Sequence, residues 1–363
     1  MSTQTQASAN AIDEQRAEEF VGKAMGDLSA TVTVLMATIG DRLGLFTTLA
    51  ERGPATSEQL AERAGIAERY AREWLGAMAA AGYFDYNPET GTYTLPAEHR
   101  PVLAAEGGPV FFGGVYEELS ALAGVLERII EAFRTGGGVA PSEYDEHFFT
   151  GLERFTAGWF NNLLLPEWLP AMPAVSQLLE AGADVADVGC GRGRALVKLA
   201  TAFPASRFVG YDAHGPSVEA ARRCAEEAGV AERLRFEQRD VAADGLSSAY
   251  DVVFTFDVIH DAVDPAEMLS AIQKALRPDG RYVCVDMNAS HRPEENAGPI
   301  GALFYGMSIL YCLTSSLAHG GAGLGTCGFN PHTVELMCKE AGFQEVRRLP
   351  LENPFNNIYE ITP

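Results

Sequence analysis

The chain is poor in positive charge, and in lysine above all. Its 363 residues include 49 Asp or Glu against 27 Lys or Arg, only 4 of which are Lys, so the net charge is −22. A surface this acidic repels the phosphate backbone, and binding to nucleic acid would need a local basic patch. Hydrophobic residues make up 47%, which excludes disorder over most of the length. The sequence therefore predicts a globular protein with one large domain and a smaller one.

Cysteine is scarce as well, and the six cysteines form no C-x-x-C pair. No cluster of Cys and His has the spacing of a zinc site, so we expect no metal. We interpret the cysteines as buried thiols in a reducing cytoplasm. The first residues lack the apolar core of a signal peptide, and we predict that residues 1–12 form a disordered tail.

One long stretch contains no charge at all. Residues 300–318 have about the length of a membrane span. Gly306 and several hydroxyl side chains interrupt the stretch, however, and no cluster of Lys or Arg flanks it. We therefore predict a buried pair of helices that covers a pocket, and no contact with a membrane.

Residues 13–105 have the pattern of a winged helix. A helix is predicted at 68–81, and two short strands at 83–86 and 92–95 flank a Pro- and Gly-containing turn. Residues 51–100 hold five Arg and eight acids, which disfavours DNA binding by this domain. We interpret it as a platform for dimerisation that also closes one side of a pocket.

Aromatic side chains crowd the segment that follows. Residues 106–165 are predicted to be a helical linker, broken at Gly136–Gly138. Most of these aromatic side chains are expected to pack in the hydrophobic core, but some can line a ligand pocket beside the next domain. The linker residues that we expect in such a pocket are Tyr144, Phe155 and Trp159.

Strands and helices then alternate through residues 166–363, which is typical of a parallel α/β sheet. Five strands are predicted, at 185–188, 207–212, 234–238, 251–256 and 281–286. A helix at 331–341 precedes a final antiparallel pair at 346–351 and 357–362.

A glycine-rich turn follows the first of these strands. In Asp187-Val-Gly-Cys-Gly-Arg-Gly193 the glycines alternate, unlike the G-x-G-x-x-G dinucleotide fingerprint. Such glycines let the backbone approach a ligand closely. Asp212 ends the second strand, where a carboxylate can accept both ribose hydroxyls, and Asp240 follows the third, where an acid can accept an adenine amino group. The pattern predicts a site for an adenine nucleoside that carries no phosphate.

With these motifs, residues 160–363 resemble the class I S-adenosylmethionine-dependent methyltransferases. The resemblance implies a Rossmann-like sheet of seven strands, mostly parallel with an antiparallel last strand, and S-adenosylmethionine as the cofactor. Val241 would offer its backbone amide to the adenine ring. The residues that the resemblance assigns to the cofactor are Asp187, Gly189, Gly191, Gly193, Asp212, Asp240, Val241, Phe256 and Asp257.

The winged helix narrows the resemblance to the O-methyltransferases, in which such a domain forms a homodimer. The whole chain is similar to a group of actinobacterial winged-helix methyltransferases. The matching segments are Gly136–Gly138, Asp257–Asp261, Gly320–Gly325 and Asn353–Asn357.

His260 and Asp261 lie just past the fourth strand, at the carboxyl edge of the sheet where ligands bind. In plant-type O-methyltransferases the His of an H-D-W segment at this place is the general base; here Ala262 replaces the Trp. The resemblance implies that His260 takes the proton, which suits its pKa, and that Asp286 orients it. Asp261 is a further catalytic candidate. The alternative is that His260 caps the next helix or binds a backbone carbonyl.

The resemblance implies methyl transfer to a small aromatic or hydrophobic acceptor, at oxygen. The charge-free stretch supplies the remaining pocket residues that we expect: Phe304, Tyr305, Met307 and Tyr311. Three alternatives stay open. The chain could methylate N, C or S by positioning alone; it could be a cofactor-sensing DNA-binding regulator; or the bound cofactor could serve a reaction without methyl transfer.

Overall fold

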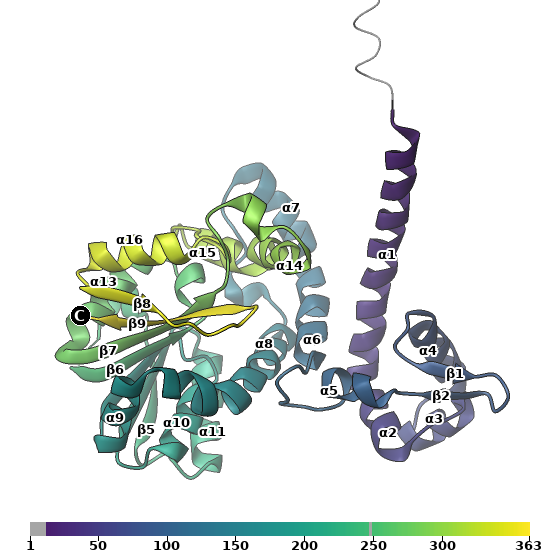
Figure 1. The fold of residues 1–363 in the computed structure, drawn as a ribbon, viewed down its shortest axis with the longest axis horizontal. Coiled ribbons are helices and arrows are strands. Elements are labelled where there is room, and N and C mark those ends of the chain that lie inside the picture. Colours follow the sequence, from purple (N-terminus) through teal and green to yellow (C-terminus); the bar gives the residue numbers. More distant parts are fainter. Residues whose placement is uncertain (1–11, 247–248) are drawn as a thin grey trace, which may run out of the picture. The chain divides into compact units, whose positions relative to one another are not determined.

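The computed structural model describes residues 12–246 and 249–363, which form two compact units (Figure 1). The first unit holds the chain up to Glu106 together with Val110–Ser120, and the second holds Gly107–Pro109 and Ala121–Pro363. The predicted division at residues 12, 105 and 165 stays a prediction. Nearly all of the tail predicted at 1–12 lies outside the described residues.

The first unit is a winged helix that follows a long helix. Its elements are α1 (Glu14–Arg42), α2 (Leu45–Arg52), α3 (Ser57–Ala64), α4 (Glu68–Ala80), β1 (Asp85–Asn87), β2 (Thr92–Thr94) and α5 (Arg100–Leu103). Thr56 and Gln59 form a capping box that starts α3, and the left-handed Gly65 ends it. The core contains Phe46, Trp74 and Phe84, whose ring centroids lie 5.3–5.9 Å apart.

The exposed arginines at the start of α4 are already paired. Arg72 Nε lies 2.9 Å from Glu68 Oε1, and Arg69 forms an ion pair with Glu73. The helix that would enter a DNA groove therefore presents balanced charge, which agrees with the interpretation of this unit as a platform.

The second unit is built on one seven-stranded sheet. Its strands are β3 (Asp184–Val188), β4 (Arg207–Asp212), β5 (Leu234–Gln238), β6 (Tyr250–Phe256), β7 (Leu276–Met287), β8 (Glu345–Arg348) and β9 (Asn356–Thr362). Their order is β5-β4-β3-β6-β7-β9-β8, and β9 runs antiparallel to both of its neighbours. The predicted fold class is confirmed.

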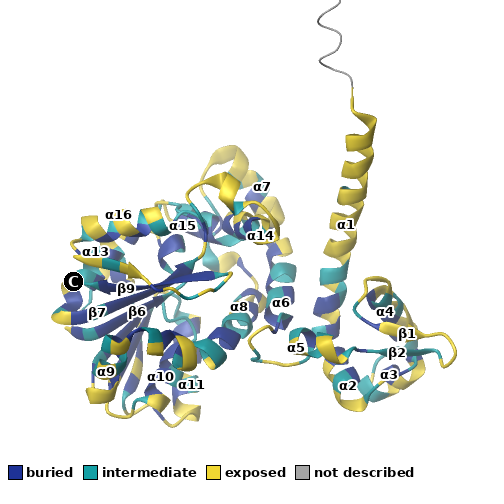
Figure 2. Ribbon diagram, in the orientation of Figure 1, coloured by how far each residue is buried: buried dark blue, intermediate teal, exposed yellow. Residues whose placement is uncertain are grey.

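Helices cover both faces of this sheet (Figure 1). They include α9 (Pro173–Ala181), α10 (Arg194–Ala202), α11 (Gly215–Glu227), α12 (Val241–Asp244), α13 (Pro265–Ala275) and α16 (Pro331–Ala341). Because each strand is buried on both sides, β6 is apolar at successive positions: Val252 and Phe254 belong to one core cluster and Val253 to the other. Figure 2 shows the strands as the buried centre of this unit.

Two further sets of helices complete the second unit beside the sheet. Before the sheet lie α7 (Leu126–Thr135), α8 (Glu146–Trp159) and the π-helix η4 (Phe160–Trp168), preceded by α6 (Gly113–Leu122), which begins in the first unit. After β7 come α14 (Pro299–Met307), the π-helix η8 (Ser308–Cys312) and α15 (Leu313–Ala318).

The charge-free stretch forms one continuous helix, not the predicted pair. No proline lies inside it, and a π-helical turn takes the place of a break. Its hydroxyl side chains tie it to the domain: Ser316 Oγ donates to Ala262 O over 2.9 Å, and Ser308 Oγ accepts from Thr326 N over 3.1 Å. By length and composition alone, this helix and α1 could each cross a membrane, at mean hydropathies of 1.5 and 1.2.

Candidate functional site

The glycine turn between β3 and α10 is held open for a ligand. Gly189 has φ 73°, and a Cβ there would lie 2.3 Å from Val258 Cγ2. Gly191 has φ 52° and nothing within 4 Å of the place of a Cβ, so a side chain would both strain the backbone and fill the open space. The end of β4 fixes the turn, because Asp212 Oδ2 accepts the Gly191 N–H over 2.8 Å and its Oδ1 accepts the His214 N–H over 2.8 Å.

A cavity of about 210 Å³ opens above this turn. Residues from α8, from the turn, and from the ends of β3, β4 and β6 line it, together with Tyr311 of η8. These include Phe149, Glu153, Phe160, Asp187, Gly189, Gly191, Arg192, Asp212, His214, Phe256, Asp257 and Asp261.

Negative charge dominates the cavity wall. Four aspartates line it, and the lining arginines are engaged by glutamates of α8. Arg192 Nη1 lies 3.1 Å from Glu153 Oε2 and also pairs with Glu146, while Arg194 Nε lies 2.6 Å from Glu153 Oε1. Among the described lining residues, neither arginine is therefore free to neutralise the four carboxyl groups, which favours a cationic ligand.

Burial shifts the pKa of each of these carboxyl groups upward. Desolvation and the Asp212 charge raise the pKa of Asp187 well above its usual range, and desolvation also raises that of Asp212. Burial and the Asp286 charge raise the pKa of Asp257 to about 8, and burial raises that of Asp261 to about 7. Without a cation, the cavity therefore holds protons near neutral pH.

Asp257 has an unusual backbone. It is the one described residue other than glycine with a positive φ, 53°, at the point where β6 ends. Such a conformation costs free energy and persists only where neighbours enforce it. Asn356 Nδ2 donates to Asp257 Oδ1 over 2.6 Å, which fixes the carboxyl group at the cavity wall.

His260 is buried next to the cavity and bound to Asp286. Its Nδ1 lies 2.7 Å from Asp286 Oδ1, and the side chains are 4% and 1% exposed. Burial alone would lower the pKa of His260, but the Asp286 carboxylate and Cys312 raise it well above 6.5. His260 does not line the cavity, whereas Asp257 and Asp261 on either side of it do.

The structure brings most of the predicted cofactor residues together. Asp187, Gly189, Gly191, Asp212, Phe256 and Asp257 all line the cavity. Gly193 lies beneath it as the left-handed start of α10. Asp240 and Val241 do not line it: Asp240 is exposed and caps α12 by accepting the amides of Ala242 and Ala243, and Val241 is buried in the core.

The predicted acceptor residues fall into separate groups. Tyr311 lines the cavity and packs against Tyr144, with ring centroids 5.2 Å apart. Phe155 and Trp159 pack instead on Phe355, whose ring centroid also lies 6.5 Å from that of Phe304. The Tyr305 side chain is exposed and its hydroxyl accepts from Asn296 Nδ2 over 3.2 Å. Met307 is half-buried and lines neither this cavity nor the next.

Sequence reasoning missed several residues of the wall. Glu153 of α8, which pairs with Arg192, is one of them. In the same wall the ring of Phe149, one of the aromatic side chains crowded into this segment, stacks on His214 with ring centroids 4.7 Å apart. Asn356 was found only as part of a matching segment. Its place at the start of the last strand, beside the carboxyl end of β7, was the signal that could have directed attention to it.

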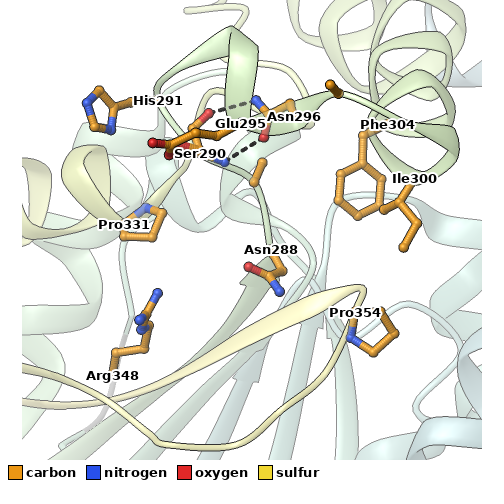
Figure 3. Close-up of a pocket in the computed structure, with 13 residues that line it drawn as sticks. Asn288, Ser290, His291, Glu295, Asn296, Ile300, Phe304, Pro331, Arg348 and Pro354 are labelled. Carbon is orange, nitrogen blue, oxygen red and sulfur yellow. Dashed lines mark hydrogen bonds between the residues drawn. The ribbon is translucent and has the colours of Figure 1, made fainter.

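A second, wider cavity of about 530 Å³ lies past the end of β7 (Figure 3). Asn288, Arg348, Phe304, Ile300 and Pro354 line it, and it shares no residue with the first cavity. Ser290 and Asn296 close one side through mutual hydrogen bonds of 2.8 Å. Among the described residues no group of His, Cys, Asp and Glu could hold a metal ion.

Comparison with known protein families places the two units. A model for Rv2258c-like winged HTH domains matches residues 30–105, and a model for methyltransferase domains matches residues 179–305. The chain joins a winged helix-turn-helix domain to a methyltransferase domain. The acid-lined cavity lies in the methyltransferase domain and in the α8 helix that precedes it.

Known relatives of the methyltransferase domain methylate oxygen according to their names. The ubiquinone biosynthesis O-methyltransferase of Cereibacter sphaeroides (strain ATCC 17025) is 33% identical over 110 residues, which are 30% of this chain and 42% of that protein. The chain thus spans less than half the length of the first curated relatives that it matches. The mitomycin biosynthesis 6-O-methyltransferase of Streptomyces lavendulae is 26% identical over 260 residues, 68% of this chain and 71% of that protein.

A solved structure shares the fold of the winged helix and the methyltransferase domain. Human N-acetylserotonin methyltransferase in complex with SAM has 17% identity and a TM-score of 0.69, over 97% of this chain and 99% of that one. This likeness confirms the fold class predicted from the sequence, and the two family models agree with the predicted order of a winged helix followed by a methyltransferase domain.

Proposed function

We propose that the protein transfers a methyl group from S-adenosylmethionine to an oxygen atom of a small molecule. The cavity above the glycine turn carries the proposal, because its wall holds four aspartates while its two described arginines are ion-paired with Glu153. S-adenosylmethionine has a positive sulfonium and no phosphate, which suits such a wall. The names of the curated relatives support oxygen as the acceptor atom.

The residues present fit this cofactor. Asp187 Oδ1 is buried without a hydrogen-bond partner, and a ligand ammonium group would satisfy it. Asp212 stands at the end of β4 and lines the cavity, where its carboxylate would accept ribose hydroxyls. Asp240 follows β5 outside this cavity, so its contact with the adenine amino group stays a prediction. When bound, the cofactor supplies an activated methyl group.

We propose that His260 removes the proton from the acceptor hydroxyl and that Asp286 orients its ring. Asp286 binds Nδ1, so the proton would be taken at Nε2. Asp261, which lines the cavity itself, is the second catalytic candidate. The aromatic groups around Tyr311 and Phe355 support a small aromatic or hydrophobic acceptor. The cytoplasmic location stays a prediction.

Calorimetry with S-adenosylmethionine tests the first half of this proposal. Incubation with a set of phenols, and analysis for S-adenosylhomocysteine and methyl ethers, tests the second half. Absence of cofactor binding would contradict the proposed activity, and methylation of amines or thiols alone would contradict the choice of oxygen.

We expect cofactor affinity to rise with pH. Asp257 and Asp261 must lose their protons to face the sulfonium as carboxylates, and their pKa values are about 8 and 7. Below these values each released proton makes binding about tenfold tighter per pH unit. Calorimetry between pH 5.5 and 7.5, in buffers of different ionisation enthalpy, measures both the affinity and the protons released.

S-adenosylhomocysteine is the matched control, because it lacks the sulfonium charge. Its affinity should depend less on pH than that of S-adenosylmethionine. Equal affinity for S-adenosylmethionine at pH 5.5 and 7.5 would contradict the assignment of these acids to the cation.

We also propose that α1 pairs with α1 of a second copy. Its exposed apolar side chains repeat with the alternating spacing of three and four residues of a coiled coil. They are Val21, Met25, Leu28, Val32, Leu35 and Ile39. In the last four positions the β-branched residues Val and Ile alternate with Leu, a pattern that favours a coiled coil of two helices. Figure 2 shows that most of α1 is exposed.

Aspartate at both Leu28 and Leu35 should therefore give a monomer. These side chains are 65% and 43% exposed, so the change leaves the core of the winged helix intact. Analytical ultracentrifugation should show twice 39.0 kDa for the wild type and 39.0 kDa for the variant. Ala30→Asp, on the opposite face of α1, is the control and should remain dimeric. A monomeric wild type that floats with lipid vesicles would contradict the pairing.

A further inference from the structure

The segment Asn353–Asn357 leads into β9 and is held firmly in place. Asn353 Oδ1 accepts the backbone amides of Phe355 and Asn356, at 2.8 and 3.1 Å. Asn288, at the end of β7, donates its side-chain amide to Asn353 O over 2.8 Å and its backbone amide to Phe355 O over 2.7 Å. Figure 3 shows Asn288 next to Pro354 of this segment. A segment with this many fixed backbone groups can hold a side chain at a defined place.

The side chain at that place is the amide of Asn356. It is 1% exposed, and its Nδ2 reaches Asp257 Oδ1 over 2.6 Å, 99 residues earlier in the chain. Its Oδ1 has no partner among the described residues. A buried amide that leaves its own oxygen unsatisfied costs free energy, so a purely structural role would be better served by an apolar side chain.

Asp257 needs a partner of this kind. Its φ of 53° is disfavoured for a residue with a side chain, and its carboxyl group lines the cofactor cavity. Asp286 and Asp261 oppose its negative charge, whereas His260 and the Asn356 amide favour it. Across the same cavity lie Asp187 and Asp212, together with His214 and the ion-paired Arg192. Among these groups, Asn356 is the uncharged side chain that donates a hydrogen bond directly to the Asp257 carboxylate.

We propose that Asn356 is a positioning residue for methyl transfer, which holds the Asp257 carboxylate at the wall of the cofactor cavity. The proposal rests on the proposed function. In this role Asn356 touches neither the cofactor nor the acceptor, and it acts through Asp257. An N–H donor stabilises the charged form of a carboxyl group, so the amide would lower the free energy of the ionised wall that meets the sulfonium.

Asn356→Ala should weaken binding of S-adenosylmethionine in a pH-dependent way. A hydrogen bond to a charged group is worth about a tenfold change in an equilibrium constant or more, so loss of the amide should raise the pKa of Asp257 further above its value of about 8. We expect about tenfold weaker binding at pH 7 and nearly equal binding at pH 9.5, where Asp257 is ionised in both proteins. Calorimetry at both pH values measures the ratio of the dissociation constants of the variant and the wild type. Titration of the ligand itself affects both constants equally and cancels in this ratio.

Two further variants separate positioning from structure. In an Asp257→Asn background the additional Asn356→Ala change should have no effect on the pH profile. Asn357→Ala is the matched control, because that neighbouring asparagine is also buried and its Nδ2 has no hydrogen-bond partner in residues 12–246 and 249–363. It should leave the pH profile unchanged.

The outcomes are distinct. A wild type that does not bind S-adenosylmethionine overturns the proposed function. A wild type that binds, with an Asn356→Ala variant equally weakened at pH 7 and pH 9.5, overturns the positioning role and leaves the proposed function intact. Unchanged binding at both pH values overturns the positioning role as well.

Discussion

Asp212→Ala protein should bind S-adenosylmethionine at least 100-fold more weakly than the wild type. The substitution removes the proposed acceptor of two ribose hydroxyls and also frees the Gly191 and His214 amides that the carboxylate now fixes. Hydrogen bonds to a charged group contribute about 1.5–3 kcal/mol each, and 100-fold corresponds to about 2.7 kcal/mol. Calorimetry at one pH measures the difference in affinity.

The control for this change is Asp279→Ala, which removes an exposed acid at the amino end of the sheet. Its cofactor affinity should equal that of the wild type. If Asp212→Ala protein bound the cofactor as tightly as the control, the assignment of this cavity to the nucleoside would be wrong.

His260→Ala should lower the turnover number by roughly 10²–10⁴-fold, and it should weaken cofactor binding near neutral pH because the His260 charge favours the ionised forms of Asp257 and Asp261. The imidazole is the proposed acceptor of the hydroxyl proton, but it does not line the cofactor cavity. Rate measurements under saturating acceptor, with calorimetry of cofactor binding, separate the two effects. His332→Ala is the control, because His332 is exposed at the start of α16.

The pH dependence of the rate tests the pair formed by His260 and Asp286. Asp286 raises the pKa of His260, and only the deprotonated ring accepts a proton, so the wild-type rate should rise with pH through this raised pKa. In Asp286→Asn protein the pKa falls, so the rise should occur at lower pH and reach a lower plateau. An unchanged pH profile would contradict the orienting role of Asp286. An unchanged rate in His260→Ala protein would mean that His260 is not the base, and that either Asp261 takes the proton or positioning alone suffices.

The parts of the structure that are local in sequence could be predicted. The alternation of strands and helices predicted the sheet. The glycine turn after β3, together with the acids near it, predicted most of the residues at the base of the cavity. Prediction of β7 began at residue 281, whereas the strand begins at Leu276. Pro278 and Gly280 interrupt the apolar pattern there, and Leu276 pairs with Tyr250 of β6 before a shift in register that ends where Arg281 pairs with Val252.

The cavity walls could not be predicted, because distant segments build them. Glu153 meets Arg192 from 39 residues earlier, and Asn356 meets Asp257 from 99 residues later. No periodicity records such pairs. The π-helical turn in residues 308–312 is equally invisible, because it adds a residue to a helix without changing the composition.

The ion pairs between α8 and the glycine turn limit how this protein could be divided. The matched methyltransferase domain begins at residue 179 and ends at residue 305. Glu146 and Glu153 precede it, while Tyr311 and Asn356 follow it, so each end of that stretch leaves out part of the wall. A chimera that exchanged residues 179–305 alone would contain the glycine turn but not Glu153 and Tyr311, which complete the wall of its cavity. The portable piece is the whole second unit, which consists of Gly107–Pro109 and Ala121–Pro363.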